Sequence, residues 1–526
     1  MSKPPLFARR TIVAAGLGLA ASAGVGRAAV MTLQRHVFRT DPFTLGVAAG
    51  DPAPDGFVIW TRLAPNPLMT DGDMPPIDVP VAWEIAEDPQ FRRIASRGEG
   101  RALATLAHAV HVEVAGLLPQ RPYWYRFVAP GNLVSPVGTA RTLPATGTNV
   151  ARVRIASVGC QNFERGYYTA YRHLSEERDI DAVFHYGDYI YEFAPRADQI
   201  VRRHWGGETL TLDDYRLRYS QYKLDRDLQA AHASAAFIMS FDDHEIDDNW
   251  AGDRGKDGGQ RAEFAARKTA AFQAWYEHVP VRRRFRPDVP GGRSYRRFDF
   301  GTLMRMHVLD TRSFRSPQLC EAPDMSRADQ SRCRPNYAAE RTMLGAEQEA
   351  WLGRGLDNAM GWNFVAQQVL MMTYDARKDG ETKPRIGTDN WGGYPHARRR
   401  FIDAVAQRGL TNVVIGSGDM HQNLIGALPS RPEDPTSKPI ASEFLATSIT
   451  SNGTGGARYP GEEHALDYNP NVKLLNNQRG YHLYSVDRRE WQADVRVVDQ
   501  VHRPDGVIVT LARFAVDPRE PGPQSA

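Results

Sequence analysis

From Ala151 onwards the chain alternates between short apolar runs and stretches with helical spacing. This alternation is typical of an α/β fold, in which buried and mostly parallel strands are joined by helices. Apolar residues at helical spacing between Glu263 and His278 predict one of these helices. The predicted buried strands are Val153–Val158, Ala182–Tyr186, Ala236–Phe241, Leu303–Leu309, Phe364–Leu370, Val413–Ile415 and Phe444–Ser448.

Residues 43–142 have a different pattern, in which β-branched and aromatic runs are separated by turns rich in Gly, Pro and Asp. Short strands at this spacing predict a small β-sandwich that resembles a fibronectin type III or immunoglobulin domain. A linker is expected at 143–149. Because 526 residues exceed what one small core organises, we expect two units, a β-sandwich domain over 43–142 and an α/β domain over 150–516. The predicted strands of the first unit are Phe57–Thr61, Val81–Ile85, Val110–Val114 and Pro122–Phe127.

The start of the chain has the pattern of an export signal. Arg9 and Arg10 precede an apolar, Gly-rich stretch from Thr11 to Val25, and small residues follow it. The stretch is short for a membrane span, and the paired arginines resemble a twin-arginine signal. We therefore expect residues 1–28 to address the chain to the twin-arginine export machinery, and the mature protein to act in the periplasm or outside the cell. An uncleaved anchor helix is the alternative.

The charge of the mature chain does not favour nucleic acid or an anionic membrane as a partner. The formal net charge is +3, but residues 1–28 carry four basic residues and no acidic one, which leaves 61 basic against 62 acidic residues. A balanced charge gives no evidence of a nucleic-acid platform or of an anionic membrane surface as partner. No other segment is apolar enough to predict a stable membrane span in the mature chain.

Three cysteines remain to be explained in an oxidising compartment. Cys320 and Cys333 lie in a polar stretch with twelve residues between them, which predicts a loop closed by a disulfide. Cys160 follows the first predicted strand of the α/β region and has no partner. It can be a buried thiol, a reactive nucleophile or a metal ligand.

Several predicted strands end in residue types that bind metal ions. In an open α/β sheet, ligands bind beyond the carboxyl ends of the strands, so these residues are expected to converge in one crevice. Acidic groups brought together repel one another unless cations neutralise them, which predicts a site for more than one ion. The candidate ligands and their neighbours are Cys160, Asp188, Tyr191, Asp243, His244, Asp248, Asn249, Asp419 and His421.

The ligand types narrow the choice of metal. Carboxylate, amide and phenolate oxygens suit ferric iron, calcium, magnesium or manganese, and the few histidines argue against an ordinary zinc cluster. Each block also has a simpler interpretation. A Gly-Asp pair after a strand is often only a turn, and an Asp-Asp-His-Glu run often begins a solvated helix.

The blocks VGCQN, GDYIYE, FDDHEIDDNW and GDMHQN together resemble the alkaline phosphatase D (PhoD) family of the calcineurin-like metallophosphoesterase superfamily. The flanking segments VAAGDPAPDGFVIWTR, AFQAWYEHVPVR, VLDTRSFRS, DNWGGYPHARRRF and NQRGYHLYSV are similar too, so the resemblance covers nearly the whole mature chain. It implies a metallophosphoesterase-like α/β sandwich that follows the N-terminal β-sandwich. It also implies an enzyme that hydrolyses phosphate esters with one Fe(3+) ion and Ca(2+) ions.

The resemblance implies roles for individual residues. By similarity Cys160, Asp188 and Tyr191 hold the iron, and Asp188 bridges to calcium. Asp419 and His421 form the last ligand block, and Asp243 is a further candidate. The family often has two asparagines where this chain has Asp248 and Asn249, which leaves open which of these two is a ligand.

The implied mechanism is attack on the phosphorus by a metal-activated hydroxide or oxide. His244 is the candidate for bonding the phosphate or protonating the leaving alkoxide, with support of a ligand as its alternative role. Arg165 and Arg267 are candidates for clamping the phosphate, with a solvated surface role as the alternative for each.

Other functions remain to be weighed against an alkaline phosphatase. A phosphodiesterase or a phospholipase D-like enzyme would use the same metals, and a non-catalytic protein would bind phosphate or a wall polymer. The chain lacks the Gly-x-Ser-x-Gly, P-loop and His-Glu-x-x-His motifs, which excludes the enzyme classes that depend on them. The Pro-rich tail after Val516 is expected either to be disordered or to cap the cleft.

Overall fold

The computed structural model describes residues 38–198, 200–256, 261–286, 288, 293–319 and 338–526. The predicted export signal and the predicted Cys320–Cys333 disulfide lie outside these residues. Among the described helices, none is long and apolar enough to cross a membrane.

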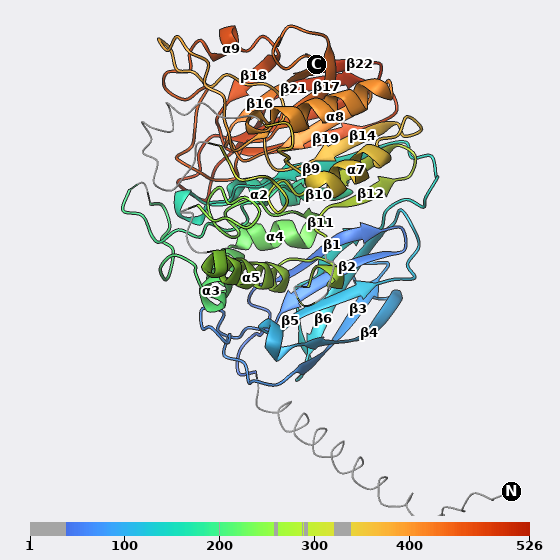
Figure 1. Ribbon diagram of the computed structural model, residues 1–526. Helices are drawn as coiled ribbons and strands as arrows, with labels where there is room; N and C mark the ends of the chain where they lie inside the picture. The colour runs from blue at the N-terminus through green and yellow to red at the C-terminus, as the bar shows by residue number, and fades with distance from the viewer. Residues whose placement is uncertain (1–37, 199, 257–260, 287, 289–292, 320–337) are drawn as a thin grey trace, which may run out of the picture.

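Two large mixed sheets form the centre of the molecule (Figure 1). The first has ten strands, in which β9, β10, β11 and β1 run parallel to one another. Its order is β22 (Glu520–Ser525), β21 (Ile508–Asp517), β20 (Trp491–Val498), β19 (Gly480–Val486), β9 (Val153–Val158), β10 (Ala182–His185), β11 (Ala236–Met239), β1 (Val47–Ala53), β2 (Gly56–Arg62) and β5 (Ala109–Val114).

The second sheet has seven strands, of which β13, β14, β15 and β17 are parallel neighbours. Its order is β12 (Arg296–Phe300), β13 (Met304–Val308), β14 (Trp362–Ala366), β15 (Val413–Ser417), β17 (Pro439–Leu445), β16 (Asn423–Pro429) and β18 (Val472–Asn476). Apolar residues of both sheets, such as Phe184, Phe364 and Tyr484, share one buried core, so the sheets pack face to face.

Helices cover the outer faces of the two sheets. The first sheet packs against α2 (Thr169–Glu176), α3 (Leu212–Lys223), α4 (Arg226–Ser234) and α5 (Arg261–His278). The second packs against α7 (Gly345–Gly355) and α8 (Pro395–Gln407), and the short α9 (Ala465–Tyr468) contributes Ala465 to the same core. The result is an α/β sandwich of four layers, so the predicted fold class is confirmed.

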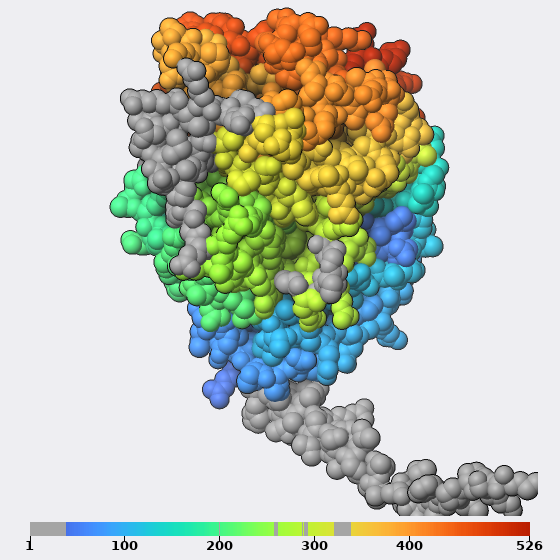
Figure 2. Space-filling model, viewed as in Figure 1, coloured from blue at the N-terminus to red at the C-terminus, as the bar shows by residue number. Residues whose placement is uncertain are grey.

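The N-terminal strands form a β-sandwich against the edge of this body. Its outer sheet has the order β4 (Ile94–Ala102), β3 (Val79–Ala86), β6 (Pro122–Ala129) and β7 (Leu133–Val134), and β8 (Gly138–Arg141) also pairs with β6. Its inner layer is β1, β2 and β5, which belong to the ten-stranded sheet because β1 pairs with β11. Figure 2 shows the N-terminal segments in blue in direct contact with the green and yellow ones. The boundaries 43–142 and 150–516 stay a prediction, because strands of the first segment continue the sheet of the second.

The predicted strands and the predicted helix are present, with ends that differ by a few residues. The last five strands of the chain, β18 to β22, were not among the predicted ones. The tail after Val516 is neither disordered nor a cap in the structure, because Glu520–Ser525 pairs with β21.

A buried ion pair fastens the N-terminal strands to the rest of the chain. Asp51 lies in β1 where its pairing with β2 is irregular, between Gly50 and Ala53, and its Oδ1 accepts hydrogen bonds from Arg296 of β12 at 2.7 and 2.9 Å. Both side chains are almost completely buried, and Arg296 also donates to the Met239 carbonyl of β11 at 2.7 Å. One guanidinium therefore joins β1, β11 and β12, which belong to both sheets.

We expect the substitution Asp51→Asn to cost about 3–5 kcal/mol of unfolding free energy, because it leaves a buried guanidinium without its charged partner. Urea denaturation measures this loss. The matched control is Asp505→Asn, which removes an ion pair between two exposed side chains and should cause no measurable change. Equal stability of Asp51→Asn and the wild type would contradict the assigned role of the pair.

Candidate metal centre

The candidate ligands lie just beyond the carboxyl ends of parallel strands from both sheets. Cys160 follows β9 by two residues, Asp188 follows β10 by three, Asp242 follows β11 by three and Asp419 follows β15 by two. Because β9, β10 and β11 are parallel neighbours in the first sheet, and β14 and β15 in the second, these ends meet at one edge. The site is therefore built where the two sheets come together.

Two glycines allow the strand ends to approach closely. A Cβ atom on Gly159 would lie 2.2 Å from the ring of Tyr186, and one on Gly418 would lie 2.3 Å from the same ring. The ring of Tyr186, after β10, thus separates the turn after β9 from the turn after β15. Any larger side chain at either glycine would push apart the loops that carry Cys160 and Asp419.

The backbone at these turns is in an unusual conformation. Positive φ angles occur at Cys160 (52°), Asp188 (56°), Asn249 (59°), Asp419 (71°) and His421 (57°). Non-glycine residues rarely adopt this region, and each one costs of order 1–3 kcal/mol in strain. Such strain concentrates at functional sites, and here it coincides with the residues predicted from the sequence.

Ligand atoms in the described part of the chain form three groups within which all atoms lie within 4.8 Å of one another. Asp188 belongs to the first two groups and Asp243 to the last two, so the groups form one continuous row. The groups are Cys160 with Asp188 and His421, Asp188 with Asp243 and His244, and Asp242 with Asp243 and Asp419.

Tyr191 joins the first of these groups. Its hydroxyl donates to Asp188 Oδ2 at 3.0 Å and lies 3.0 Å from His421 Nε2. Burial raises the pKa of Tyr191 well above its ordinary value, and the charge of Asp188 adds to the shift. Burial and the nearby charge of Arg479 lower the pKa of His421 to about 3, so this imidazole is neutral and able to coordinate a metal.

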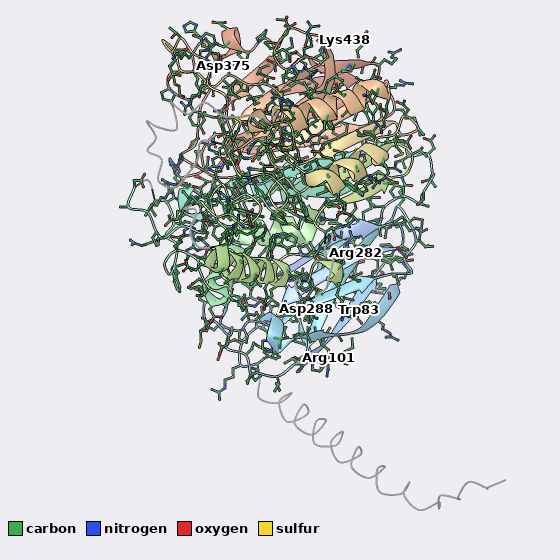
Figure 3. All side chains as sticks on the ribbon, viewed as in Figure 1. Trp83, Arg101, Arg282, Asp288, Asp375 and Lys438 are labelled. Atoms are coloured by element: carbon green, nitrogen blue, oxygen red, sulfur yellow. The ribbon has the colours of Figure 1, made fainter. Side chains whose placement is uncertain are left out.

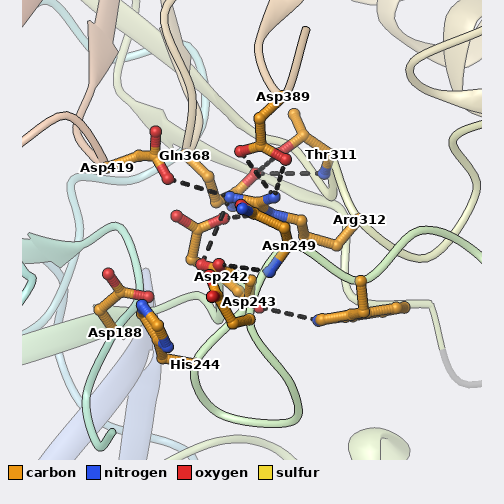
Figure 4. A network of polar contacts seen from close by, with 12 residues as sticks. Asp188, Asp242, Asp243, His244, Asn249, Thr311, Arg312, Gln368, Asp389 and Asp419 are labelled. Atoms are coloured by element: carbon orange, nitrogen blue, oxygen red, sulfur yellow. Dashed lines mark hydrogen bonds and ion pairs between the residues drawn. The ribbon is translucent and has the colours of Figure 1, made fainter. Parts of the chain in front are cut away.

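A single guanidinium lies at the centre of the acidic cluster (Figure 4). Arg312 is completely buried and forms ion pairs with Asp242, with Asp389 at 2.8 Å, with Asp419 at 3.1 Å and with Asp243 at 3.4 Å. These carboxylates come from three different loops, so Arg312 holds the loops together and offsets part of their repulsion.

The remaining charge still favours cations. Burial opposes ionisation of Asp243, but Arg312 and His244 lower its pKa below the ordinary value. Burial and neighbouring carboxylates raise the pKa of Asp188, Asp242 and Asp419 well above their ordinary values. Two buried carboxylate oxygens, Asp188 Oδ1 and Asp242 Oδ2, have no hydrogen-bond partner. Unpartnered buried oxygens beside a thiol, a phenol and a neutral imidazole fit the coordination of hard cations.

His244 differs from His421 in charge. Its Nδ1 lies 2.8 Å from Oε2 of the buried Glu192, and its pKa is raised well above its ordinary value because Glu192, Asp243 and Asp188 outweigh the effect of burial. Glu245 connects two loops, because it accepts hydrogen bonds from the NH groups of Tyr189 at 2.6 Å and Asp242 at 2.8 Å.

Asp248 and Asn249 have different surroundings. The carboxylate of Asp248 forms an ion pair with Lys256, and its NH donates to Glu192 at 2.9 Å. The NH of Asn249 donates to Asp243 Oδ2 at 2.7 Å. In the amide orientation that satisfies both side-chain atoms, Asn249 also donates to Asp389 at 3.2 Å.

Neither candidate phosphate clamp reaches the cluster. The guanidinium of Arg165 donates to the Asp198 carbonyl at 3.0 Å and lies 3.8 Å from the Asp198 carboxylate. Arg267 donates to Tyr215, Asp247 and Glu208, each at 3.0 Å. Within the described residues, neither guanidinium has a contact with the three ligand groups.

Six residues of the site were not singled out from the sequence: Asp242, Glu245, Arg312, Asp389, Glu192 and Arg479. Arg312 lies three residues after the predicted strand Leu303–Leu309, so a search for strand ends that included cations would have found it. Arg479 is completely buried and donates to the His421 carbonyl at 2.8 Å, which fixes the last ligand loop. Glu192 ends the block GDYIYE and Asp389 begins the segment DNWGGYPHARRRF, so the family resemblance marks both positions, although it does not indicate their contacts.

Comparison with known proteins places the chain among phosphatases. Residues 155–495 match the family model of PhoD-like phosphatases, and residues 28–144 match the N-terminal domain of PhoD-like phosphatases. Alkaline phosphatase D of Bacillus subtilis (strain 168) is 41% identical over 516 residues, which cover 97% of this chain and 86% of that protein.

Solved structures agree with this placement. The structure of PhoD matches with a TM-score of 0.87 and 41% identity, over 93% of each chain. The purple acid phosphatase PPD1 of yellow lupin (Lupinus luteus) matches with a TM-score of 0.50 and 12% identity, over 90% of this chain and 74% of that one. At that identity the likeness shows a shared fold only.

We expect Arg312→Met to lower the unfolding free energy by about 3–5 kcal/mol, because it leaves buried carboxylates without their cation. Adding Asp242→Asn should restore about 0.5–3 kcal/mol, since the carboxylate of Asp242 pairs with Arg312 and its unpaired charge is then removed. Urea denaturation of the two single variants and the double variant measures both effects. Arg101→Met, at an exposed arginine of β4, is the control. Unchanged stability of Arg312→Met would contradict the role of Arg312 as internal counter-ion.

Proposed function

The chain belongs to the PhoD-like phosphatase family and is a phosphoric ester hydrolase, and from this premise we propose that it is an exported alkaline phosphatase that depends on iron and calcium. Its substrates are phosphate esters, and we propose monoesters as the first substrates and diesters as the second. A phosphodiesterase or phospholipase D-like preference is the alternative. A non-catalytic phosphate- or wall-polymer-binding role has no support from the family.

The row of three ligand groups carries the metal part of the proposal. The first group, with Cys160, Asp188, His421 and the phenol of Tyr191, would hold ferric iron, since thiolate and phenolate ligands suit this ion. The oxygen-rich groups around Asp243 and Asp419 would hold calcium. Asp188 would bridge the two kinds of site because it belongs to the first two groups.

Of the two residues that the sequence left open, we propose Asn249 rather than Asp248 as the ligand. Lys256 already pairs with the Asp248 carboxylate, whereas Asn249 lies against Asp243 and Asp389. The proposal keeps Asp248 as the partner of Lys256.

Bound cations would polarise the phosphoryl oxygens and supply a nucleophilic oxygen at the pH of the cell. The residues of the chain orient the reaction around them. Arg312 and Glu245 fix the carboxylates in position, and Arg479 fixes His421. His244, charged beside Glu192, would donate a proton from its Nε2 to the oxygen of the leaving alkoxide.

The location of the enzyme is also a proposal. Arg9 and Arg10, followed by a short apolar stretch, support export by the twin-arginine machinery to the periplasm or beyond. This route carries folded proteins, so the chain would take up its metal ions before it leaves the cytoplasm.

We expect the exported protein to contain iron, near one ion per chain, together with calcium. A calcium chelator should abolish hydrolysis of p-nitrophenyl phosphate, and added calcium should restore it. Metal analysis and assays before and after chelation measure this, and bis-p-nitrophenyl phosphate gives the ratio of monoester to diester hydrolysis. A metal-free chain with full activity would contradict the proposal.

We expect His244→Asn to lower kcat for an alkyl phosphate about 10²–10⁴-fold, the usual contribution of a general acid. The loss for p-nitrophenyl phosphate should be smaller, since that leaving group needs no proton. The matched control is His464→Asn, at an exposed histidine that pairs with Asp467 at the surface. An equal loss for both substrates would contradict proton donation by His244 and indicate support of a ligand instead.

A further inference from the structure

Three side chains beside His244 form what we call the basic rim: Phe193, Arg196 and Lys256. Phe193 follows Glu192, the partner of His244, and its half-buried ring meets the imidazole of His244 edge to face, with 5.1 Å between ring centroids. Arg196 and Lys256 both lie over the ring of Phe193, at 4.2 and 5.4 Å from its centroid. Two cations and an aromatic ring thus lie next to the second ligand group.

Arg196 has no charge partner among the residues that the structure describes. Its side chain is exposed and stacks on Phe193, which leaves the N–H groups at the edge of the guanidinium directed away from the ring. No hydrogen bond or ion pair of this guanidinium to a described residue is found, whereas Arg165 and Arg202 nearby both pair with aspartates. The guanidinium of Arg196 therefore lies on Phe193 with its N–H donors available to bind a ligand.

Lys256 is the second cation of the rim. Its side chain is 46% exposed, and its ammonium group pairs with Asp248 while keeping further donors. The acidic groups nearby are already engaged, because Glu192 bonds His244 and the NH of Asp248. Because Asp248 balances Lys256, the positive charge that the rim leaves uncompensated is that of the exposed Arg196, beside the acidic cluster.

The position of the rim defines what it can contact. In the proposed function the phosphate that is cleaved binds at the ligand groups, and His244 belongs to the second of these groups. Phe193 contacts the imidazole directly, and the two cations lie on Phe193. The part of the substrate that reaches the rim is then the leaving alcohol and not the phosphate that is cleaved.

We propose that the basic rim binds an anionic group on the leaving alcohol, so that preferred substrates carry a second carboxylate or phosphate beside the phosphate ester. The inference rests on the proposed function, because it takes the ligand groups as the place where the phosphate ester is cleaved. Arg196 would hold the anion through paired N–H donors, and Lys256 would add a second positive charge.

The test compares two substrates that each carry one phosphate: glycerol 1-phosphate, with a neutral leaving group, and 3-phosphoglycerate, whose leaving group carries a carboxylate. The wild type should prefer 3-phosphoglycerate in kcat/KM. In Arg196→Ala the ratio of the two kcat/KM values should fall about tenfold, the low end for a hydrogen bond to a charged group. The loss should appear in KM, and salt should lower the wild-type ratio.

Two variants control the comparison. Arg196→Lys keeps the positive charge but lacks the paired N–H donors of a guanidinium, so its ratio of kcat/KM values should lie between those of the wild type and Arg196→Ala. Arg101→Ala removes an exposed arginine of β4, in the N-terminal sandwich (Figure 3), and should keep the wild-type ratio.

The outcomes separate the two proposals. Hydrolysis of both substrates with the same ratio in the wild type and Arg196→Ala overturns the rim and leaves the phosphatase proposal intact. A metal-loaded chain that hydrolyses neither substrate overturns both. A tenfold lower ratio in Arg196→Ala, with an intermediate ratio in Arg196→Lys and the wild-type ratio in Arg101→Ala, supports the rim.

Discussion

The repulsion between buried carboxylates is the constraint on which the rest of this structure depends. Asp242, Asp243, Asp389 and Asp419 converge on Arg312, and Arg315 also pairs with Asp389 at 2.8 Å, so two guanidinium groups face four carboxylates and leave part of their charge unbalanced. The loops nevertheless stay assembled because several neutral contacts support them. Gln368, after β14, accepts from the hydroxyl of Thr311 and donates to the hydroxyl of Ser240, each at 2.6 Å, and so ties the two sheets together beside Arg312.

The two histidines of the site differ in charge because their neighbours carry opposite charges. His421 lies beside Arg479, whose charge and the surrounding burial keep the imidazole neutral. His244 lies beside Glu192 and between acidic neighbours, which keep it charged. The site thus contains a neutral imidazole suited to coordination and a charged imidazole suited to proton donation. Asp188 lies between the two, because it shares one ligand group with His421 and another with His244.

The sequence allowed the positions of the ligand blocks to be predicted because a simple rule connects them. Parallel strands end at the same edge of a sheet, and Cys160, Asp188, Asp243 and Asp419 each follow a recognisable apolar run. Arg312 follows such a run too, but a rule based on metal-ligand residue types does not indicate an arginine. The roles of Glu192 and Asp389 depend on how loops fold back in space.

Arg165 was proposed as a clamp because it is near Cys160 in sequence, and in the structure its guanidinium pairs with Asp198. A Pro-rich composition conceals only β22, which pairs with β21, whereas β19 to β21 have the β-branched and aromatic pattern of strands and are open to prediction from the sequence.

The central claim is that the row of ligand groups holds iron at Cys160 and calcium at the oxygen-rich groups, with Asp188 between them. Crystals of the exported protein, measured on both sides of the iron absorption edge, test this claim most directly. The account predicts one iron peak in the anomalous difference map between Cys160, Asp188, Tyr191 and His421. It also predicts calcium density beside Asp243. An iron peak elsewhere in the molecule, or a centre without metal in protein that hydrolyses phosphate esters, would contradict it.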